Sequence, residues 1–213
     1  MKSSSYEHYK DLVVFYKATD TYENKWWDII IKMYAEEQRY YHTLDHIEDI
    51  FNKLKDKNLQ PFDKHVMSMT VLFHDIIYQP TKHDNEDQSA SLFLEFAIDF
   101  CIPKEESDVV VEIILATKNH TKHKDGSYIM HVFLDLDLSI LGSNQQDYDT
   151  YAKNIRNEYN HVDDQTFKTE RGKFLTSWIN KIESGESLFY TDTMRSLYEA
   201  KSLINMKREL QNL

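Results

Sequence analysis

Glycine and proline are scarce in this chain of 213 residues, which has four glycines and three prolines. An all-β sandwich or barrel needs many tight turns, so this scarcity favours long helices with few connections. The glycines are 13 to 30 residues apart along the chain. That spacing excludes a phosphate-binding P-loop, a GxGxxG dinucleotide-binding turn and a GxSxG nucleophile elbow.

Cysteine is nearly absent, and a positive net charge and long apolar runs are missing. Cys101 is the only cysteine, which excludes an intramolecular disulfide framework and a zinc site built from cysteines. The formal net charge of −11 repels a phosphate backbone and argues against nucleic-acid polymers as partners. No stretch approaches the ~20 apolar residues that span a bilayer, and the N-terminal segment lacks an apolar signal region. We therefore expect a cytoplasmic protein that does not contact membranes.

The apolar residues that are present follow a helical period almost throughout. Hydrophobic residues make up 41% of the chain and aromatic residues 13%, enough for a sizeable core. No internal repeat, low-complexity segment or flexible linker interrupts the chain, which favours one domain over residues 1–213. A loop is expected at 119–131, and helices are expected at 6–18, 23–36, 42–57, 61–80, 85–100, 103–118, 145–160, 164–183 and 193–211.

The apolar run VFLDLDLSIL at 132–141 is ambiguous, because its LDLDLSI portion also alternates with the period of two that is typical of a strand. A single strand would have no partner elsewhere in the chain. We therefore predict a helix.

The informative polar residues are histidines and aspartates placed within apolar helices. His74 and Asp75 are adjacent in VLFHDIIY, which we expect at the centre of the most apolar helix. Burying an unpaired carboxylate costs several kcal/mol, and a cation would be a suitable partner. Asp135 and Asp137 raise the same question in VFLDLDLSIL.

Two further histidines have a spacing that suits ligands. His42 and His46, in RYYHTLDHI, are i and i+4 on the predicted helix and would share a face. The chain thus places imidazole and carboxylate groups within predicted helices that are otherwise apolar. Such groups suit a divalent cation such as Mn²⁺, Fe²⁺, Co²⁺, Zn²⁺ or Mg²⁺.

The order His42, then His74-Asp75, then Asp137 resembles the H…HD…D signature of the HD-domain metal-dependent phosphohydrolases. The motifs RYYHTLDHI, FHDIIYQP, NEDQSA and FLDLDLSILG, with IRNEY and YEAKSLINMKREL further on, resemble a bacterial branch of that superfamily, the predicted metal-dependent HD-superfamily phosphohydrolases. The resemblance covers roughly residues 35–210.

The resemblance implies an all-α fold, a single compact HD-domain-like helical bundle with the C-terminal helices packed on it. The metal-binding core would cover about 35–142 and the helical extension 143–213. His42, His74, Asp75 and Asp137 would hold one divalent metal ion. The identity of the ion (Mn, Fe, Co, Ni, Zn or Mg) stays open, although four protein ligands leave room for substrate only at coordination five or six.

The implied activity is hydrolysis of a phosphate ester or anhydride in a small phosphorylated molecule, commonly a nucleotide. Water would attack phosphorus, so no protein nucleophile is required. Two alternatives stay open: a non-catalytic module that senses a phosphorylated ligand, and an HD-type phosphodiesterase of cyclic nucleotides or dinucleotides. The sequence does not indicate an oligomeric state.

Three residues are candidates for catalysis. Glu86 is a candidate general acid or base, or else an ordinary acidic residue near a helix N-terminus. His120 is a candidate phosphate contact, or else a helix C-cap. His46 is a candidate ligand, substrate contact, hydrogen-bond donor behind the ligands, or core histidine.

Two positively charged features are candidates for contact with an anion. Arg39 could bind a phosphate or lie on the surface without a specific role. The basic segment 117–124, TKNHTKHK, could attract an anionic substrate or form a solvated loop.

Asp135 and Asp137 can be separated by the geometry of a helix. Residues two apart on a helix point about 200° from each other, so only one of the two can face a metal ion. The resemblance assigns that role to Asp137. We expect Asp135 to accept hydrogen bonds from a neighbouring helix or from solvent.

Overall fold

A computed structural model describes residues 3–55, 59–120 and 123–213 of the chain. These residues form helices joined by loops and turns, with no strand among them, so the all-α prediction is confirmed. The chain divides into two compact units, Met1–His120 and Thr121–Leu213. The predicted end of the third helix at 56–57 and residues 121–122 of the basic segment lie outside the described residues. A single domain over 1–213 stays a prediction.

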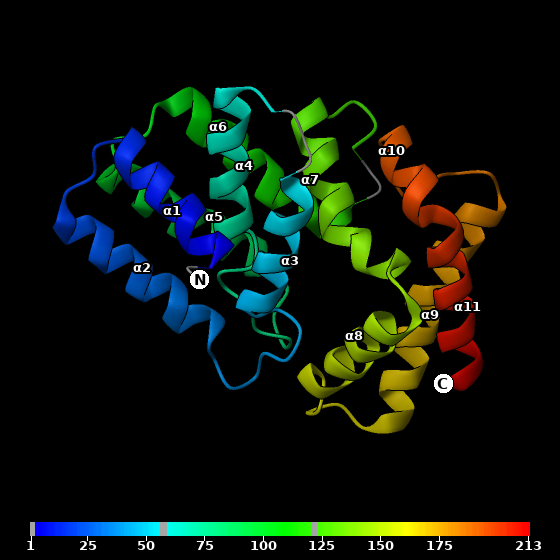
Figure 1. Ribbon diagram of the computed structural model, residues 1–213. Helices are drawn as coiled ribbons and strands as arrows, with labels where there is room; N and C mark the ends of the chain where they lie inside the picture. The colour runs from blue at the N-terminus through cyan, green and yellow to red at the C-terminus, as the bar shows by residue number, and fades with distance from the viewer. Residues whose placement is uncertain (1–2, 56–58, 121–122) are drawn as a thin grey trace. The chain divides into compact units, whose positions relative to one another are not determined.

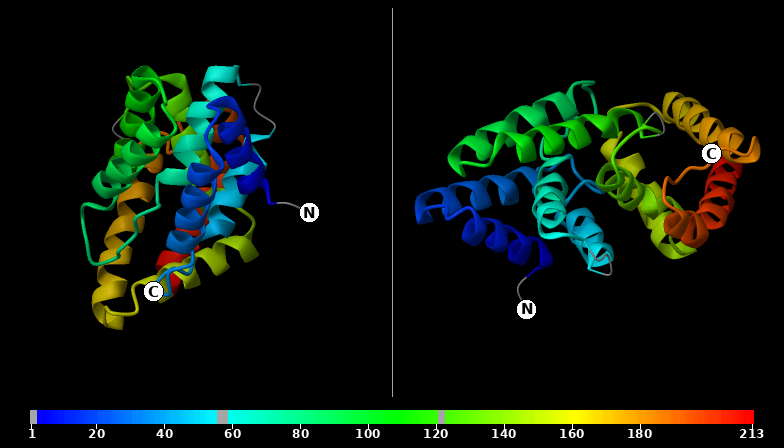
Figure 2. Two further views of the ribbon diagram at one scale, coloured as in Figure 1. Left: turned by 90° about the vertical axis from the view of Figure 1, so that its left-hand side faces the viewer. Right: turned by 90° about the horizontal axis from the view of Figure 1, so that it is seen from above.

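The first unit is built around α4 (Pro61–Phe73), which Figure 1 shows among the other helices of this unit. Pro61 occupies the first turn of α4. Every residue from Val66 to Phe73 is buried, because α4 packs against helices on several sides. Its neighbours are α1 (Ser4–Phe15), α3 (Leu44–Leu54), α5 (Asn85–Asp99) and α6 (Lys104–Ala116). Helix α2 (Asp20–Tyr34) and the short 3₁₀ turn η1 (Thr117–Asn119) complete this unit. Helices α5 and α6 lie side by side (Figure 2).

Helix α4 ends at Phe73, so the prediction that it continues toward Pro80 is wrong. The helix can end early because backbone groups of the following residues have other partners. The Ser89 hydroxyl accepts a hydrogen bond from the Ile77 N–H at 3.1 Å, and the Asn85 side-chain oxygen accepts one from the Gln79 N–H at 3.0 Å. Side chains of α5 thus replace helical partners for this turn.

The second unit contains α7 (Tyr128–Leu138), the 3₁₀ turn η2 (Ser139–Gly142), α8 (Gln145–Glu158), α9 (Asp164–Glu183), α10 (Asp192–Met194), the π-helical turn η3 (Arg195–Glu199) and α11 (Ala200–Asn212). Helix α11 packs against α8, α9 and η2, and Figure 1 shows it beside α9. The segment 132–141 is helical, as predicted.

One predicted boundary in this unit is wrong, and one predicted helix contains an irregular turn. The loop expected through residue 131 ends earlier, because the Ser127 hydroxyl caps α7 by accepting a hydrogen bond from the Met130 N–H at 3.3 Å. The helix expected at 193–211 has a π-helical turn near its start. At Gly142 a Cβ atom would lie 2.6 Å from the Tyr198 carbonyl oxygen, so only glycine allows η2 to approach this turn so closely.

Among the described residues, no helix is both long enough and apolar enough to cross a membrane.

Candidate metal centre

The candidate ligands of the first unit come from two short segments. His46 lies in the first turn of α3, whereas His42 lies before that helix, because Thr43 is extended and caps its start. The Thr43 hydroxyl accepts a hydrogen bond from the Asp45 N–H at 3.3 Å. The prediction that His42 and His46 share one helix is therefore wrong, although their rings still lie 6.1 Å apart, centroid to centroid.

His74 and Asp75 follow α4 directly and do not lie at its centre, as the sequence had suggested. The His74 N–H still donates to the Thr70 carbonyl at 2.9 Å, so His74 closes the last turn of the helix. Asp75 was expected to be buried but is only partly so, because 21% of its side chain is exposed. Its place in the turn after the helix brings the carboxylate to the edge of the core.

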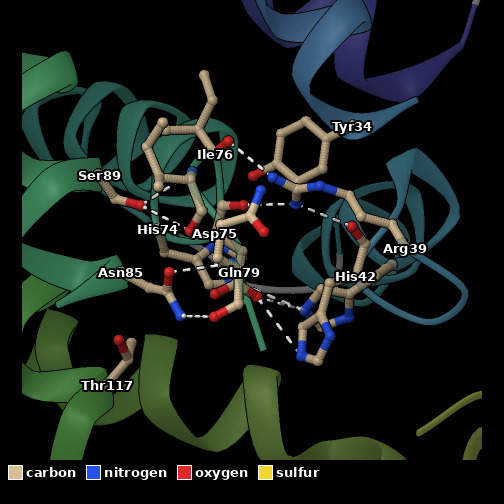
Figure 3. Close-up of polar contacts among 12 residues, drawn as sticks. Tyr34, Arg39, His42, His74, Asp75, Ile76, Gln79, Asn85, Ser89 and Thr117 are labelled. Atoms are coloured by element: carbon tan, nitrogen blue, oxygen red, sulfur yellow. Dashed lines mark hydrogen bonds and ion pairs between the residues drawn. The ribbon is translucent and has the colours of Figure 1, made fainter. Parts of the chain in front are cut away.

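Three imidazole nitrogens lie within 4.0 Å of one oxygen of the Asp75 carboxylate, and Figure 3 labels two of these residues, His42 and His74. Its Oδ2 atom lies 3.1 Å from His74 Nε2, 3.9 Å from His42 Nε2 and 4.0 Å from His46 Nε2. The Nε2 atoms of His46 and His74 are 3.4 Å apart. One ligand atom from each of His46, His74 and Asp75 lies within 4.8 Å of the others, a grouping that could hold a metal ion.

The His74 ring is oriented by its other nitrogen. His74 Nδ1 lies 3.1 Å from the Val71 carbonyl oxygen, which can only accept a hydrogen bond. In the neutral ring Nδ1 therefore carries the hydrogen, and Nε2 presents its lone pair toward Asp75 and His46. A backbone carbonyl behind a metal-binding histidine serves this purpose in many metal sites.

The donor set suits a cation. A neutral His74 Nε2 and a carboxylate oxygen repel each other at 3.1 Å unless a proton or a cation lies between them. His46 Nε2 faces the same point, and at most one of the two facing nitrogens can carry a hydrogen toward the other. His46 and His74 are almost fully buried, whereas Asp75 and His42 are each about one-fifth exposed. One divalent cation would satisfy all of these lone pairs at once.

His42 is held by two tyrosines. Its ring stacks on Tyr78 with centroids 4.1 Å apart and meets Tyr41 edge-on at 5.0 Å. Neither tyrosine stands out in the sequence, because a single tyrosine in a chain with 14 of them carries no functional signal.

The turn that carries Asp75 is also fixed by residues that sequence reasoning missed. Besides accepting hydrogen bonds, Asn85 donates its side-chain N–H to the Gln79 carbonyl at 3.0 Å (Figure 3). Asn85 and Ser89 are four residues apart, so both lie on the side of α5 that faces this turn. Small polar residues on the inward side of a predicted helix are the signal that could have found them.

Arg39 is buried, with none of its side chain exposed, and is not a surface residue. Its guanidinium donates to the Glu36 carboxylate and to backbone carbonyls of the two segments that carry the cluster. The hypothesis that it binds phosphate is therefore not supported by its surroundings.

Asp135 and Asp137 both lie on α7, in the second unit. Asp135 is buried and accepts hydrogen bonds from the backbone N–H groups of Tyr190 and Thr191, as expected for a structural role. Burial raises the pKa of Asp135, and these hydrogen bonds oppose that rise. Asp137 is half-buried, and its role as a ligand stays a prediction.

The remaining candidates lie at the borders of helices. Glu86 is half-buried in the first turn of α5, next to Asn85, and His120 is half-buried directly after η1. Lys118 of the basic segment forms an ion pair with Asp87, which lowers the local positive charge available to an anion. The catalytic roles of Glu86 and His120 stay predictions.

In comparisons with known proteins, no family model, no curated protein and no solved structure matches the chain.

Proposed function

We propose that this protein is a metal-dependent phosphohydrolase that cleaves a phosphate ester or anhydride in a small phosphorylated molecule, with nucleotides as the favoured class. The observation that supports it is the convergence of the Nε2 atoms of His46 and His74 on the Asp75 carboxylate, with His42 Nε2 3.9 Å from the same oxygen. These groups match the chemistry of a divalent-cation site. The order of the motifs in the sequence supports the reaction class.

The proposed ligands are His42, His46, His74 and Asp75, all of the first unit, and a ligand role for Asp137 rests on the resemblance of the sequence alone. His46 thus joins the ligands, one of the roles that the sequence left open for it beside a catalytic one. A divalent cation, when bound, would activate water as the nucleophile at neutral pH and would neutralise negative charge on the phosphoryl oxygens. The partial exposure of His42 and Asp75 gives the substrate a side from which to approach.

The other side chains would move protons and hold the phosphoryl group. Glu86, as a carboxylate, can accept the proton of the attacking water. His120, when protonated, can donate a hydrogen bond to a phosphoryl oxygen or a proton to the leaving group. The His74 ring keeps its tautomer throughout, because Nδ1 remains bonded to the Val71 carbonyl.

A substrate screen tests this proposal. The purified protein is stripped of metal with a chelator and supplied in turn with Mn²⁺, Fe²⁺, Co²⁺, Ni²⁺, Zn²⁺ and Mg²⁺. Phosphomonoesters, nucleoside triphosphates and cyclic dinucleotides are then offered, and release of phosphate, pyrophosphate or nucleoside monophosphate is measured. We expect turnover with at least one pair of metal and substrate.

Two variants control for contaminating phosphatases. Asp75→Asn should lose the activity, because it removes the central carboxylate. Asp45→Asn changes an exposed carboxylate on the same helix as His46 and should retain it. Turnover that survives Asp75→Asn, or its absence with every metal and substrate, would contradict the proposal. Tight substrate binding without product release would instead identify a sensor.

A further inference from the structure

Arg39 connects the two segments that carry the candidate ligands. It lies in the loop between α2 and α3, and its side chain is completely buried. One guanidinium nitrogen, Nη1, donates to the His42 carbonyl at 3.0 Å and to the Asp75 carbonyl at 2.7 Å. The Nη2 atom donates to the Ile76 carbonyl at 2.8 Å. Figure 3 shows the guanidinium between the His42 segment and the turn after α4.

These hydrogen bonds leave the Arg39 guanidinium few N–H donors with which to bind a substrate. Both hydrogens of Nη1 are used by carbonyl oxygens, and the Nε hydrogen goes to the Glu36 carboxylate at 3.1 Å. Burying a guanidinium is costly, and its charge is compensated by one carboxylate and three carbonyl oxygens. Two aromatic rings also pack near the guanidinium, whose central carbon lies 5.0 Å from the Tyr34 ring centroid and 5.6 Å from that of Tyr78.

The two carbonyls on Nη1 belong to residues whose side chains meet in the cluster. His42 and Asp75 are 33 positions apart in the sequence, and neither is inside a regular helix. Their separation is therefore not set by helix geometry. A single nitrogen that bonds both backbones sets it directly.

We propose that Arg39 is a positioning residue that holds His42 and Asp75 at ligand spacing before a cation binds. This inference rests on the proposed metal site. A planar guanidinium presents several donors in fixed directions, so it can hold three carbonyls at once. A lysine at this position would keep the charge but would offer one nitrogen on a flexible stem, which cannot reproduce the same geometry.

The test compares metal binding by the wild type and Arg39→Lys. Dissociation constants for Mn²⁺, Co²⁺ and Zn²⁺ are measured by calorimetry on metal-free protein, and the visible absorption of bound Co²⁺ reports the ligand arrangement. Loss of a residue that orients ligands typically weakens metal binding about 10–100-fold. We expect a loss of that size in Arg39→Lys, together with an altered Co²⁺ spectrum at saturation.

Arg156→Lys is the matched control. Arg156 lies in the second unit and likewise donates to backbone carbonyls, those of Tyr159 at 2.8 Å and Val162 at 3.1 Å. Replacing it tests the general cost of losing an arginine that bonds to backbone, and it should leave metal affinity and the Co²⁺ spectrum unchanged.

Two further variants test the same role if Arg39→Lys does not fold. Glu36→Gln leaves Arg39 in place and weakens the ion pair that orients its Nε, and it should reduce metal affinity several-fold. In Arg39→Ala, millimolar guanidinium should restore metal affinity and the wild-type Co²⁺ spectrum, whereas equal concentrations of ammonium should not.

The outcomes separate this inference from the function on which it rests. If the wild type binds metal and Arg39→Lys or Glu36→Gln binds it with the same affinity and spectrum, the positioning role is overturned and the metal site stands. If the wild type binds no divalent cation, both are overturned. Metal binding without turnover of any phosphate compound would overturn the hydrolase proposal and leave the role of Arg39 intact.

Discussion

Asp135 accepts two hydrogen bonds from Thr191, one from its backbone N–H at 2.8 Å and one from its hydroxyl at 2.7 Å. The second carboxylate oxygen accepts the Tyr190 N–H at 2.7 Å. The Thr191 hydroxyl in turn accepts the Met194 N–H and caps α10. The carboxylate thus fixes the segment that leads into α10 and α11.

Asp135→Asn and Asp137→Asn should therefore have opposite consequences. In Asp135→Asn an N–H₂ group replaces one acceptor oxygen and faces a donor, so we expect a loss of about 2 kcal/mol in the free energy of unfolding. Metal content should be retained. Asp137→Asn should lose metal affinity with little change in stability. Urea unfolding and elemental analysis of both proteins check this pair, and the reverse pattern would reassign the two aspartates.

Asp75→Ala should abolish metal binding while costing the metal-free protein little. The Asp75 side chain is one-fifth exposed, so its removal leaves no large cavity, and we expect a change within about 1 kcal/mol. Thermal unfolding with and without chelator is the measurement. The wild type should be stabilised by added divalent cation and the variant should not. Full metal affinity in Asp75→Ala would contradict the site.

Protonation of His8 should lower the free energy of unfolding at pH values below neutrality. It stacks on Phe51 with ring centroids 4.1 Å apart, and its Nδ1 lies 3.0 Å from the Ser68 hydroxyl. Burial lowers the pKa of His8 below its ordinary value of 6.5, although nearby Asp11 opposes this shift. As the pH falls, His8 therefore takes up a proton at a higher pH in the unfolded chain than in the folded protein. The stabilisation of the fold by neutral His8 is complete above pH 6.5 and is lost as the pH falls below that value.

Replacing His8 by a residue that does not titrate tests this pH dependence. His8→Gln should lower stability at pH 7.5 but flatten its decline between pH 7.5 and 5.5. His83→Gln, at an exposed position, should change neither. The check is the midpoint of urea unfolding across this pH range. An unchanged decline in His8→Gln would show that other groups carry the acid sensitivity.

Arg171 and Glu209 form a buried ion pair that joins α9 to α11. Arg171 donates to both carboxylate oxygens, at 2.7 and 3.1 Å, and the Tyr148 hydroxyl donates to the same carboxylate at 2.6 Å. Breaking a buried pair by removing one partner typically costs about 3–5 kcal/mol, because a charge is left buried without compensation. We expect Glu209→Ala to fall in that range in urea unfolding.

The double variant Arg171→Met with Glu209→Leu should recover much of the loss, since neither charge remains to be compensated. The exposed pair of Glu170 and Lys173 is the control, and Lys173→Ala should cost less than about 1 kcal/mol. A cost for Glu209→Ala no larger than that of this control would mean that the buried pair contributes little.

The sequence was sufficient to predict the helical class and most helix positions, because apolar periodicity and scarce breakers both act locally. It failed where tertiary contacts replace local hydrogen bonds. Helix α4 stops at Phe73 although the apolar pattern continues to Tyr78, because Asn85 and Ser89 bind the next turn. The π-helical turn at Arg195–Glu199 packs closely against Gly142 through Tyr198, and no local pattern encodes that contact.

The candidate site was partly predictable for the same reason. Histidine and aspartate within apolar segments stand out, and His46, His74 and Asp75 do lie together. Arg39 looked like a surface residue, because no local pattern shows that two segments 33 positions apart meet at its guanidinium. Asp137 belongs to the other unit, and its ligand role is still carried by the resemblance alone.

In the proposed metal site, the imidazole Nε2 atoms around Asp75 bind one divalent cation. Long-range ¹H–¹⁵N correlation spectra of the histidine rings test it directly, with the chain's ten histidines assigned by substitution. In metal-free protein, His74 should carry its hydrogen on Nδ1. One equivalent of Zn²⁺ should shift the Nε2 resonances of His46 and His74 in the wild type and leave them unchanged in Asp75→Asn. A hydrogen on His74 Nε2 of the neutral ring, or no shift at either residue on adding Zn²⁺, would contradict the account.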